Sequence, residues 1–166
     1  MKPAFPCFIA SLLLLGGATA CSKEDAAPQE EFFLRATKNS TPWTATGTGT
    51  FNKTSGQLYV FGTTGEAAQS ELLSIGVALP AAPQLAPAQA LRASWVTLVG
   101  GDAVTNSYVA DDAKLPIVEI TRLDTVAKVV EGRFTTTLLR EKRWTAQEEA
   151  LRFTDGSFRI HYTPVQ

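Results

Sequence analysis

Apolar and polar residues alternate with a period of two along much of the chain, and this period predicts β-strands. In the stretch QLYVFG, Leu58 and Val60 fall on one face, and Tyr59 and Phe61 fall on the other. Three later stretches alternate in the same way. Their apolar or small faces consist of Leu73, Ile75, Val77 and Leu79, then Val130, Gly132, Phe134, Thr136 and Leu138, then Phe158, Ile160 and Tyr162. Each stretch is typical of a strand with one face in a core and the other in solvent.

Threonine-rich runs and turn residues support the same interpretation. The runs WTATGTGTF and RFTTTLL favour strands, because β-branched side chains lose rotamer freedom in helices and fit a pleated surface. The runs are separated by NKTSG after Phe51, TTGEA after Gly62 and VGGD before Ala103. We expect TDGS to join ALRF and FRIHY as a tight hairpin, with Asp155-Gly156 supplying the positive φ. About eight or nine strands predict an all-β fold, either an antiparallel sandwich or a small barrel.

Two segments depart from this alternation. Residues 80–89, PAAPQLAPAQ, contain three prolines, which removes backbone donors and predicts a crossover loop outside the sheet. Residues 140–150, REKRWTAQEEA, are densely charged and have helical propensity. They are expected to form either one helical turn or a long hairpin tip.

The N-terminus is typical of a secretory signal. Lys2 precedes an apolar stretch that is most hydrophobic in FIASLLLL and is too short to span a membrane. The small residues Ala18 and Ala20 predict cleavage between Ala20 and Cys21. The stretch ATAC resembles the lipobox of bacterial lipoproteins, although Ala18 stands where leucine is usual. The resemblance implies a diacylglyceryl group, with acyl chains such as palmitate, on the sulfur of Cys21.

Cysteine usage favours this interpretation over an ordinary secreted protein. Cys7 would leave with the signal, so the mature chain would hold one cysteine and no internal disulfide. A free thiol is a liability in an oxidising compartment. The expected organisation is a lipoprotein signal at residues 1–20, a flexible acidic tether at 21–31 and one β domain at 32–166. Acyl chains on Cys21 would attach the domain to a membrane without a spanning segment.

The tether also carries an address. Ser22, Lys23, Glu24 and Asp25 resemble the short acidic export signal of Bacteroidetes-type lipoproteins. This resemblance implies attachment to the outer membrane, at the cell surface, with a periplasm-facing position as the alternative. The chain has 15 Lys and Arg against 16 Asp and Glu and no basic stripe, which excludes nucleic acid as a partner.

Several longer stretches together resemble a family. FLRATKNSTPWTA, VEITRLDTVAKVVEGRFTTTLL and the closing LRFTDGSFRIHY look like small uncharacterised lipoprotein domains of Bacteroidetes, although Asn39, Ser40 and Thr41 replace the usual glycine-lysine turn. The resemblance implies an all-β lipoprotein and transfers no site residue except Cys21.

Catalytic and metal-binding patterns are weak. His161 is the single histidine, shares a strand face with Arg159 and has no nucleophile motif beside it. Asp102, Asp111 and Asp112 could contribute to a calcium site, but ordinary acidic turns explain them better. The glycines of GTGTFN at Gly47 fit a bulge or close packing better than a nucleotide loop. No cofactor or metal is expected.

Aromatic residues and one short motif provide the remaining candidates. Trp43 and Trp95 fit core positions, whereas Trp144 lies in a charged segment and is a candidate glycan contact, with packing favoured. Asp124-Thr125-Val126 resembles an O-glycosylation motif of Bacteroidetes-type exported proteins, with Thr125 as the acceptor; a simple turn is favoured.

The leading hypothesis is a non-enzymatic lipoprotein whose β domain binds an unknown protein or glycan partner or has a structural role. The alternative is a glycan-binding accessory module at the cell surface, resting on Trp144. A third hypothesis is a hydrolase using the carboxylates of Asp111, Asp112 and Glu119.

Overall fold

The computed structural model describes residues 32–66, 68–79, 87–144 and 148–166. The segment that holds Ala20, Cys21 and the predicted export signal Ser22 to Asp25 lies outside the described residues. Nine strands make up the described fold: β1 (Phe33–Lys38), β2 (Thr41–Asn52), β3 (Gln57–Glu66), β4 (Gln69–Ala78), β5 (Pro87–Val99), β6 (Ala103–Ala110), β7 (Ile117–Asp124), β8 (Val129–Arg140) and β9 (Ala150–Val165). The all-β fold predicted from the alternation is confirmed.

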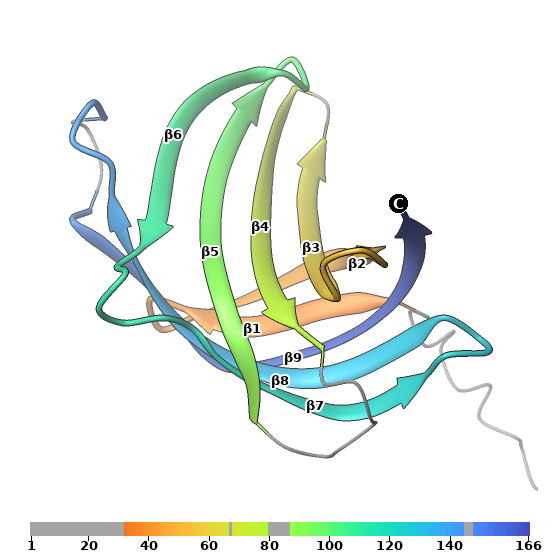
Figure 1. Cartoon of the computed structure of the whole chain (residues 1–166). Coiled ribbons are helices and arrows are strands. Elements are labelled where there is room, and N and C mark those ends of the chain that lie inside the picture. Colours follow the sequence, from red (N-terminus) through yellow and green to blue (C-terminus); the bar gives the residue numbers. More distant parts are fainter. Residues whose placement is uncertain (1–31, 67, 80–86, 145–147) are drawn as a thin grey trace, which may run out of the picture.

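The nine strands form one sheet that closes on itself. Strands β2 to β5 pair in sequence, and β5 then pairs with both β6 and β7, which both pair with β8. Strand β8 pairs with β9, and β9 returns to β2 directly and through β1. Figure 1 shows β3 to β6 curving as one layer over a second layer that contains β1, β9, β8 and β7. The arrangement agrees with the expected sandwich or small barrel.

Inward-facing apolar side chains fill the space between the two layers. The four predicted alternating faces are confirmed, because their large apolar members are buried except for Leu79, which is half-buried. The most completely buried large side chains include Leu34, Leu58, Leu73, Ile75, Phe153 and Ile160. Gly47 lies where a Cβ would come within 2.8 Å of the backbone of Phe33, which confirms the close-packing interpretation of this glycine.

The predicted hairpin at Asp155-Gly156 is wrong. Strand β9 runs without interruption from Ala150 to Val165, and Asp155 has a φ of 52° inside it. The register against β8 shifts here, since Phe134 faces Gly156 while Thr136 faces Phe153. The positive φ predicted from this dipeptide therefore belongs to a β-bulge, in which an extra residue is accommodated without reversing the strand.

The ends of two further strands differ from the predictions, and the pairing of β8 with β9 favours one of two alternatives for the segment between them. Strand β3 continues through TTGE to Glu66, so the following turn lies later than predicted. Pro87 begins β5, where a missing donor is tolerated at the first strand position, so residues 87–89 belong to the sheet; residues 80–86 lie outside the described residues. Strands β8 and β9 pair up to Leu139 and Ala150, which favours the long hairpin tip over one helical turn; residues 145–147 of this segment lie outside the described residues.

Candidate functional site

Polar side chains gather in the interior of the closed sheet at one end, although the interiors of proteins are usually apolar. The Nζ atom of Lys38 on β1 donates to both carboxylate oxygens of Glu71 on β4, at 2.7 and 2.8 Å. The indole Nε1 of Trp43 on β2 donates to the same carboxylate at 2.8 Å. The Lys38 ammonium also lies 5.0 Å from the ring centroid of Trp95. One carboxylate therefore ties three strands together by charge-assisted hydrogen bonds.

This network spans a gap in the backbone pairing. Strand β2 pairs with β3 only from Thr46 to Asn52, so the first residues of β2 and the last residues of β3 diverge. A cleft of about 480 Å³ occupies the gap and is lined by Lys38, Thr41, Pro42, Trp43, Thr44, Thr64, Gly65, Gln69 and Glu71. Because Glu71 reaches β1 and β2 from β4, its side chain joins the two sides of the cleft where hydrogen bonds between strands are missing.

Two buried polar atoms at this end lack a partner. The Nε1 atom of Trp95 and the Oγ1 atom of Thr136 have no hydrogen bond to any described residue, although both side chains are buried. An unsatisfied buried donor or acceptor costs stability unless water reaches it. This end of the interior therefore contains polar groups both with and without partners among the described residues.

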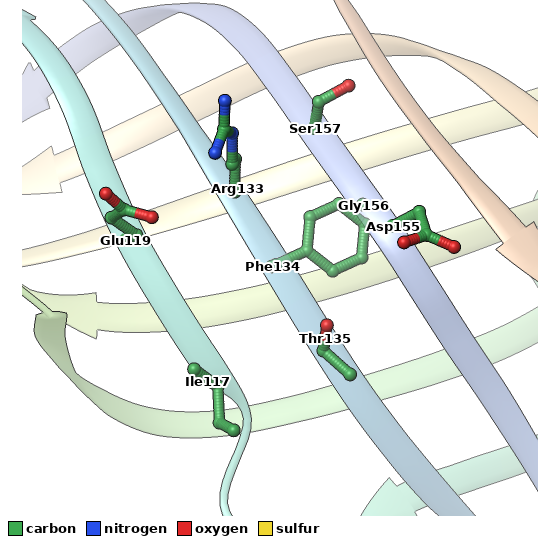
Figure 2. A pocket seen from close by; sticks show the side chains of 8 residues that line it. All are labelled: Ile117, Glu119, Arg133, Phe134, Thr135, Asp155, Gly156 and Ser157. Carbon is green, nitrogen blue, oxygen red and sulfur yellow. The ribbon is translucent and has the colours of Figure 1, made fainter.

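A second cluster of charges surrounds a hollow of about 440 Å³ on the outer face of β7, β8 and β9. Glu119, Arg133 and Ser157 face one another across these three strands, as the register requires. Figure 2 shows them side by side, with Asp155 and Thr135 on the other side of the hollow. Within the described part of the chain, no hydrogen bond or ion pair engages the side chains of Glu119, Arg133 or Asp155. These charged groups are exposed and available to a polar ligand.

The bulge in β9 positions one of these charges. Asp155 is in the left-handed region, which aspartate tolerates better than most residues because its short side chain can hydrogen-bond locally. A bulge redirects the side chain of the extra residue, and such irregularities often occur near functional sites. The carboxylate of Asp155 therefore lines the hollow because of the backbone irregularity, and a regular strand would not place it in the same way.

A third hollow, of about 380 Å³, lies on the outer face of the other layer. It is lined by Tyr59, Ser74, Arg92, Ala93, Ser94, Val109, Ala110 and Asp112. Tyr59 is 36% exposed and is the one aromatic among the exposed large hydrophobic side chains of the described residues. This hollow combines an aromatic ring with hydroxyl groups and a pair of opposite charges.

The three tryptophans do not form a common site. Trp43 and Trp95 are each 6% exposed and belong to the core, as predicted. Trp144 is half-buried in the tip between β8 and β9, its Nε1 has no partner among the described residues, and the guanidinium of Arg143 lies 5.2 Å from its ring centroid.

The carboxylates named as candidate catalytic residues line different surfaces. Glu119 lines the hollow of Figure 2, whereas Asp112 lines the hollow beside Tyr59. The carboxylate of Asp111 accepts a hydrogen bond from the backbone N–H of Ala113 at 2.9 Å, as in an ordinary turn. Glu119 and Asp155 line the same hollow, although the sequence predicts Asp155 in a hairpin turn.

The remaining candidates lie on the surface. His161 is exposed and its ring centroid lies 5.9 Å from that of Phe32. Asp102 lies in the turn that also contains Gly100 and Gly101, and no group of three or more His, Cys, Asp or Glu in the described ranges could hold a metal ion. Thr125 lies in the exposed turn between β7 and β8.

Sequence reasoning missed Lys38 and Glu71, although a signal was present. Lys38 follows Leu34 and Ala36 on the alternating face of β1, and Glu71 precedes Leu73 on that of β4. Two opposite charges on inward-facing positions indicate an interior ion pair. Asp155 was missed because its dipeptide is more familiar from hairpins.

No protein-family model, no curated protein and no solved structure matches this chain. Among the described residues, the structure contains no helix of the length and apolarity that crossing a membrane requires.

Proposed function

We propose that this protein is a lipid-anchored envelope protein whose β domain binds a ligand or partner through its surface and is not an enzyme. The observation that carries the proposal is the position of Cys21, directly after the small residues of the predicted cleavage site. The first strand begins at Phe33, close to the predicted end of the tether at residue 31. A short connection between an acylated residue and a folded domain is what an anchored protein needs.

The physical basis of attachment is the burial of acyl chains in the bilayer. Each buried methylene contributes about 0.8 kcal/mol, so a single chain binds weakly and two or more chains bind durably. A diacylglyceryl cysteine supplies two chains. The domain itself would then require no membrane-inserted surface.

Metabolic labelling with palmitate and fractionation of the envelope test the anchor. Wild-type protein should carry the label and stay with the membrane fraction, and Cys21→Ser should lose both properties. Label-free wild type, or a Cys21→Ser protein that remains membrane-bound, would refute the anchor. Replacing Ser22, Lys23, Glu24 and Asp25 with alanine serves as the matched control, because acylation should persist while exposure to external protease falls.

A second candidate function is a glycan-binding accessory module at the cell surface. The observation that favours it is the exposed ring of Tyr59 in a hollow that also holds Arg92 and Asp112. This second candidate rests on Tyr59 on β3, which is on the opposite layer of the sheet from Trp144.

The proposed O-glycosylation of Thr125 is supported by the exposure of its turn, in which the neighbouring Val126 is 91% exposed. A modified residue should add the mass of a glycan to the secreted protein, and Thr125→Ala should remove that mass. A wild-type spectrum of bare polypeptide would exclude the modification.

A further inference from the structure

The ring of Tyr59 rests against the outer face of the sheet above a glycine. Tyr59 on β3 faces Gly76 on β4, and a Cβ at Gly76 would lie 3.2 and 3.4 Å from two ring carbons of Tyr59. The Oη atom of Tyr59 is fixed by a hydrogen bond of 2.9 Å with Oε1 of Gln57. The absence of a side chain at position 76 therefore lets the ring lie close to the sheet, and Tyr59 remains 36% exposed to solvent.

A bulge next to this ring brings a charged side chain to the same place. Ile75 faces Ala93 and Val77 faces Ala90, so Leu91 and Arg92 of β5 together oppose Gly76. The guanidinium of Arg92 lies 3.8 Å from the carboxylate of Asp112, and both side chains are 83% exposed. Such an exposed pair is held weakly, and both groups remain able to bind another molecule.

The floor between the ring and the charges is small and polar. Ser74 on β4 faces Ser94 on β5, and both line the hollow together with the buried Ala93. The hollow, about 380 Å³, falls within the size of small-ligand sites, about 300–1,000 Å³. The charges of Arg92 and Asp112 offset each other, so the pair has no net charge with which to select a ligand of one sign.

We propose that this hollow binds a neutral carbohydrate, with one face of a pyranose ring against Tyr59 and its hydroxyl groups bound by Arg92 and Asp112. A pyranose presents C–H groups on its face and hydroxyls at its edge. The aromatic ring of Tyr59 can pack against the C–H groups of the pyranose face. The guanidinium of Arg92 can donate hydrogen bonds to neighbouring hydroxyls, and the carboxylate of Asp112 can accept hydrogen bonds from them. This inference rests on the part of the proposed function that makes the β domain a binding domain. It adds the class of ligand, a neutral carbohydrate, and the site that binds it.

An array of neutral and uronate oligosaccharides, followed by calorimetric titration of the strongest neutral ligand, tests the site with the mature chain in detergent micelles. Wild type should bind neutral oligosaccharides in preference to uronates. Tyr59→Ala should weaken binding about tenfold or more, the scale on which a stacked aromatic acts. Tyr59→Phe keeps the ring and should bind within about threefold of wild type, because only a hydrogen bond to Gln57 is lost.

Two further variants separate this site from its rivals. Asp112→Asn changes an exposed side chain without threatening the fold and should weaken binding about threefold to tenfold, as expected for a charge-assisted hydrogen bond. Trp144→Ala should leave binding unchanged. Absence of neutral-sugar binding by folded wild type, equal binding by Tyr59→Ala, or loss of binding in Trp144→Ala would overturn the proposal. Palmitate labelling is independent of these titrations, so failure of the anchor and failure of the sugar site are distinguishable.

Discussion

Two pairs of opposite charges, one inside the closed sheet and one on its outer surface, differ in burial, in distance and in the groups that support them. Lys38 and Glu71 face the interior, with side chains 21% and 28% exposed and a distance of 2.7 Å. Arg92 and Asp112 face solvent at 3.8 Å. The interior carboxylate is also bound by Trp43, whereas no other described residue forms a hydrogen bond or ion pair with the side chains of the exterior pair. We infer that the interior pair stabilises the fold and that the exterior pair is available for binding.

The difference follows from solvation. A charge that leaves water loses hydration and must recover that free energy through close partners, which the interior pair obtains from short bonds and from the ring of Trp95. A charge that stays in water loses little and gains little. The same chemical groups therefore act differently according to the face on which alternation places them.

Removing the interior carboxylate should have the largest effect. Glu71→Ala leaves the half-buried Lys38 ammonium and the N–H of the buried Trp43 without their acceptor, and we expect a loss of about 2–3 kcal/mol in the free energy of unfolding. Urea denaturation followed by tryptophan fluorescence measures this loss. A change below about 0.5 kcal/mol would mean that the pair does not hold the β2–β3 gap closed.

Two variants refine this result. Glu71→Gln keeps an acceptor for Trp43, so roughly half of the loss should remain. The double variant Lys38→Met with Glu71→Leu should be more stable than Glu71→Ala, because replacing a whole ion pair with apolar side chains avoids an unpaired charge. A double variant less stable than Glu71→Ala would show that the attraction within the pair exceeds the free energy lost when its two charges leave water.

The exterior face provides the next test at Asp155. Asp155→Val places a β-branched residue at a φ of 52° and should cost about 1–2 kcal/mol in urea denaturation. Asp155→Gly removes the same charge but suits this backbone, so it should be as stable as wild type. Equal losses in both variants would show that the carboxylate itself stabilises the fold. That result would contradict the inference that exterior charges contribute little to stability.

The same residue shows where sequence reasoning succeeds and fails. Alternation identified the buried faces of β3, β4, β8 and β9, because a period of two reports directly which side chains face the core. The Asp155-Gly156 dipeptide correctly signalled a positive φ, but a local conformation does not determine whether a strand reverses or bulges. That outcome depends on the pairing of β9 with β1 and β8, which the local sequence does not contain.

The hollows were beyond sequence reasoning for a related reason. Tyr59 and Arg92 are far apart in the chain and meet through strand register and a bulge in β5. The sequence favours Trp144 as a candidate because it is a tryptophan among charged residues, and only the structure shows that the guanidinium of Arg143 lies 5.2 Å from its ring centroid. Exposure of an aromatic side chain depends on tertiary packing, which composition does not reveal.

Asp124 is an exception to the contrast between the interior and exterior charges, because it is an exterior carboxylate that stabilises the fold. Its Oδ1 atom accepts hydrogen bonds from the backbone N–H groups of Ala127 at 2.8 Å and Val126 at 3.0 Å. The bond from Ala127, followed by the bond from Val126 and the charge of Arg122, holds the pKa of Asp124 below its usual value.

A lowered pKa makes the contribution depend on pH. The ionised form is favoured in the folded state, so the stabilisation is complete above the ordinary aspartate pKa, about 4, and is lost as the pH falls through the lower folded-state value. Asp124→Asn keeps an acceptor oxygen but cannot titrate. The difference in unfolding free energy between wild type and Asp124→Asn should therefore shrink between pH 7 and pH 2. A difference that is constant with pH would show that the charge of Asp124 makes no contribution.

The smallest effect on stability is expected at the exterior pair. Arg92→Ala and Asp112→Ala should each change the free energy of unfolding by about 0.5 kcal/mol or less, because an exposed pair at 3.8 Å is screened by water and salt. Urea denaturation at low and high salt measures both variants against Glu71→Ala. Losses as large as that of Glu71→Ala would mean that the Arg92 bulge is part of the structural framework. Near-zero losses, together with weakened sugar binding, would assign this pair to recognition, since a group that contributes nothing to the fold but is required for a ligand acts through the ligand alone.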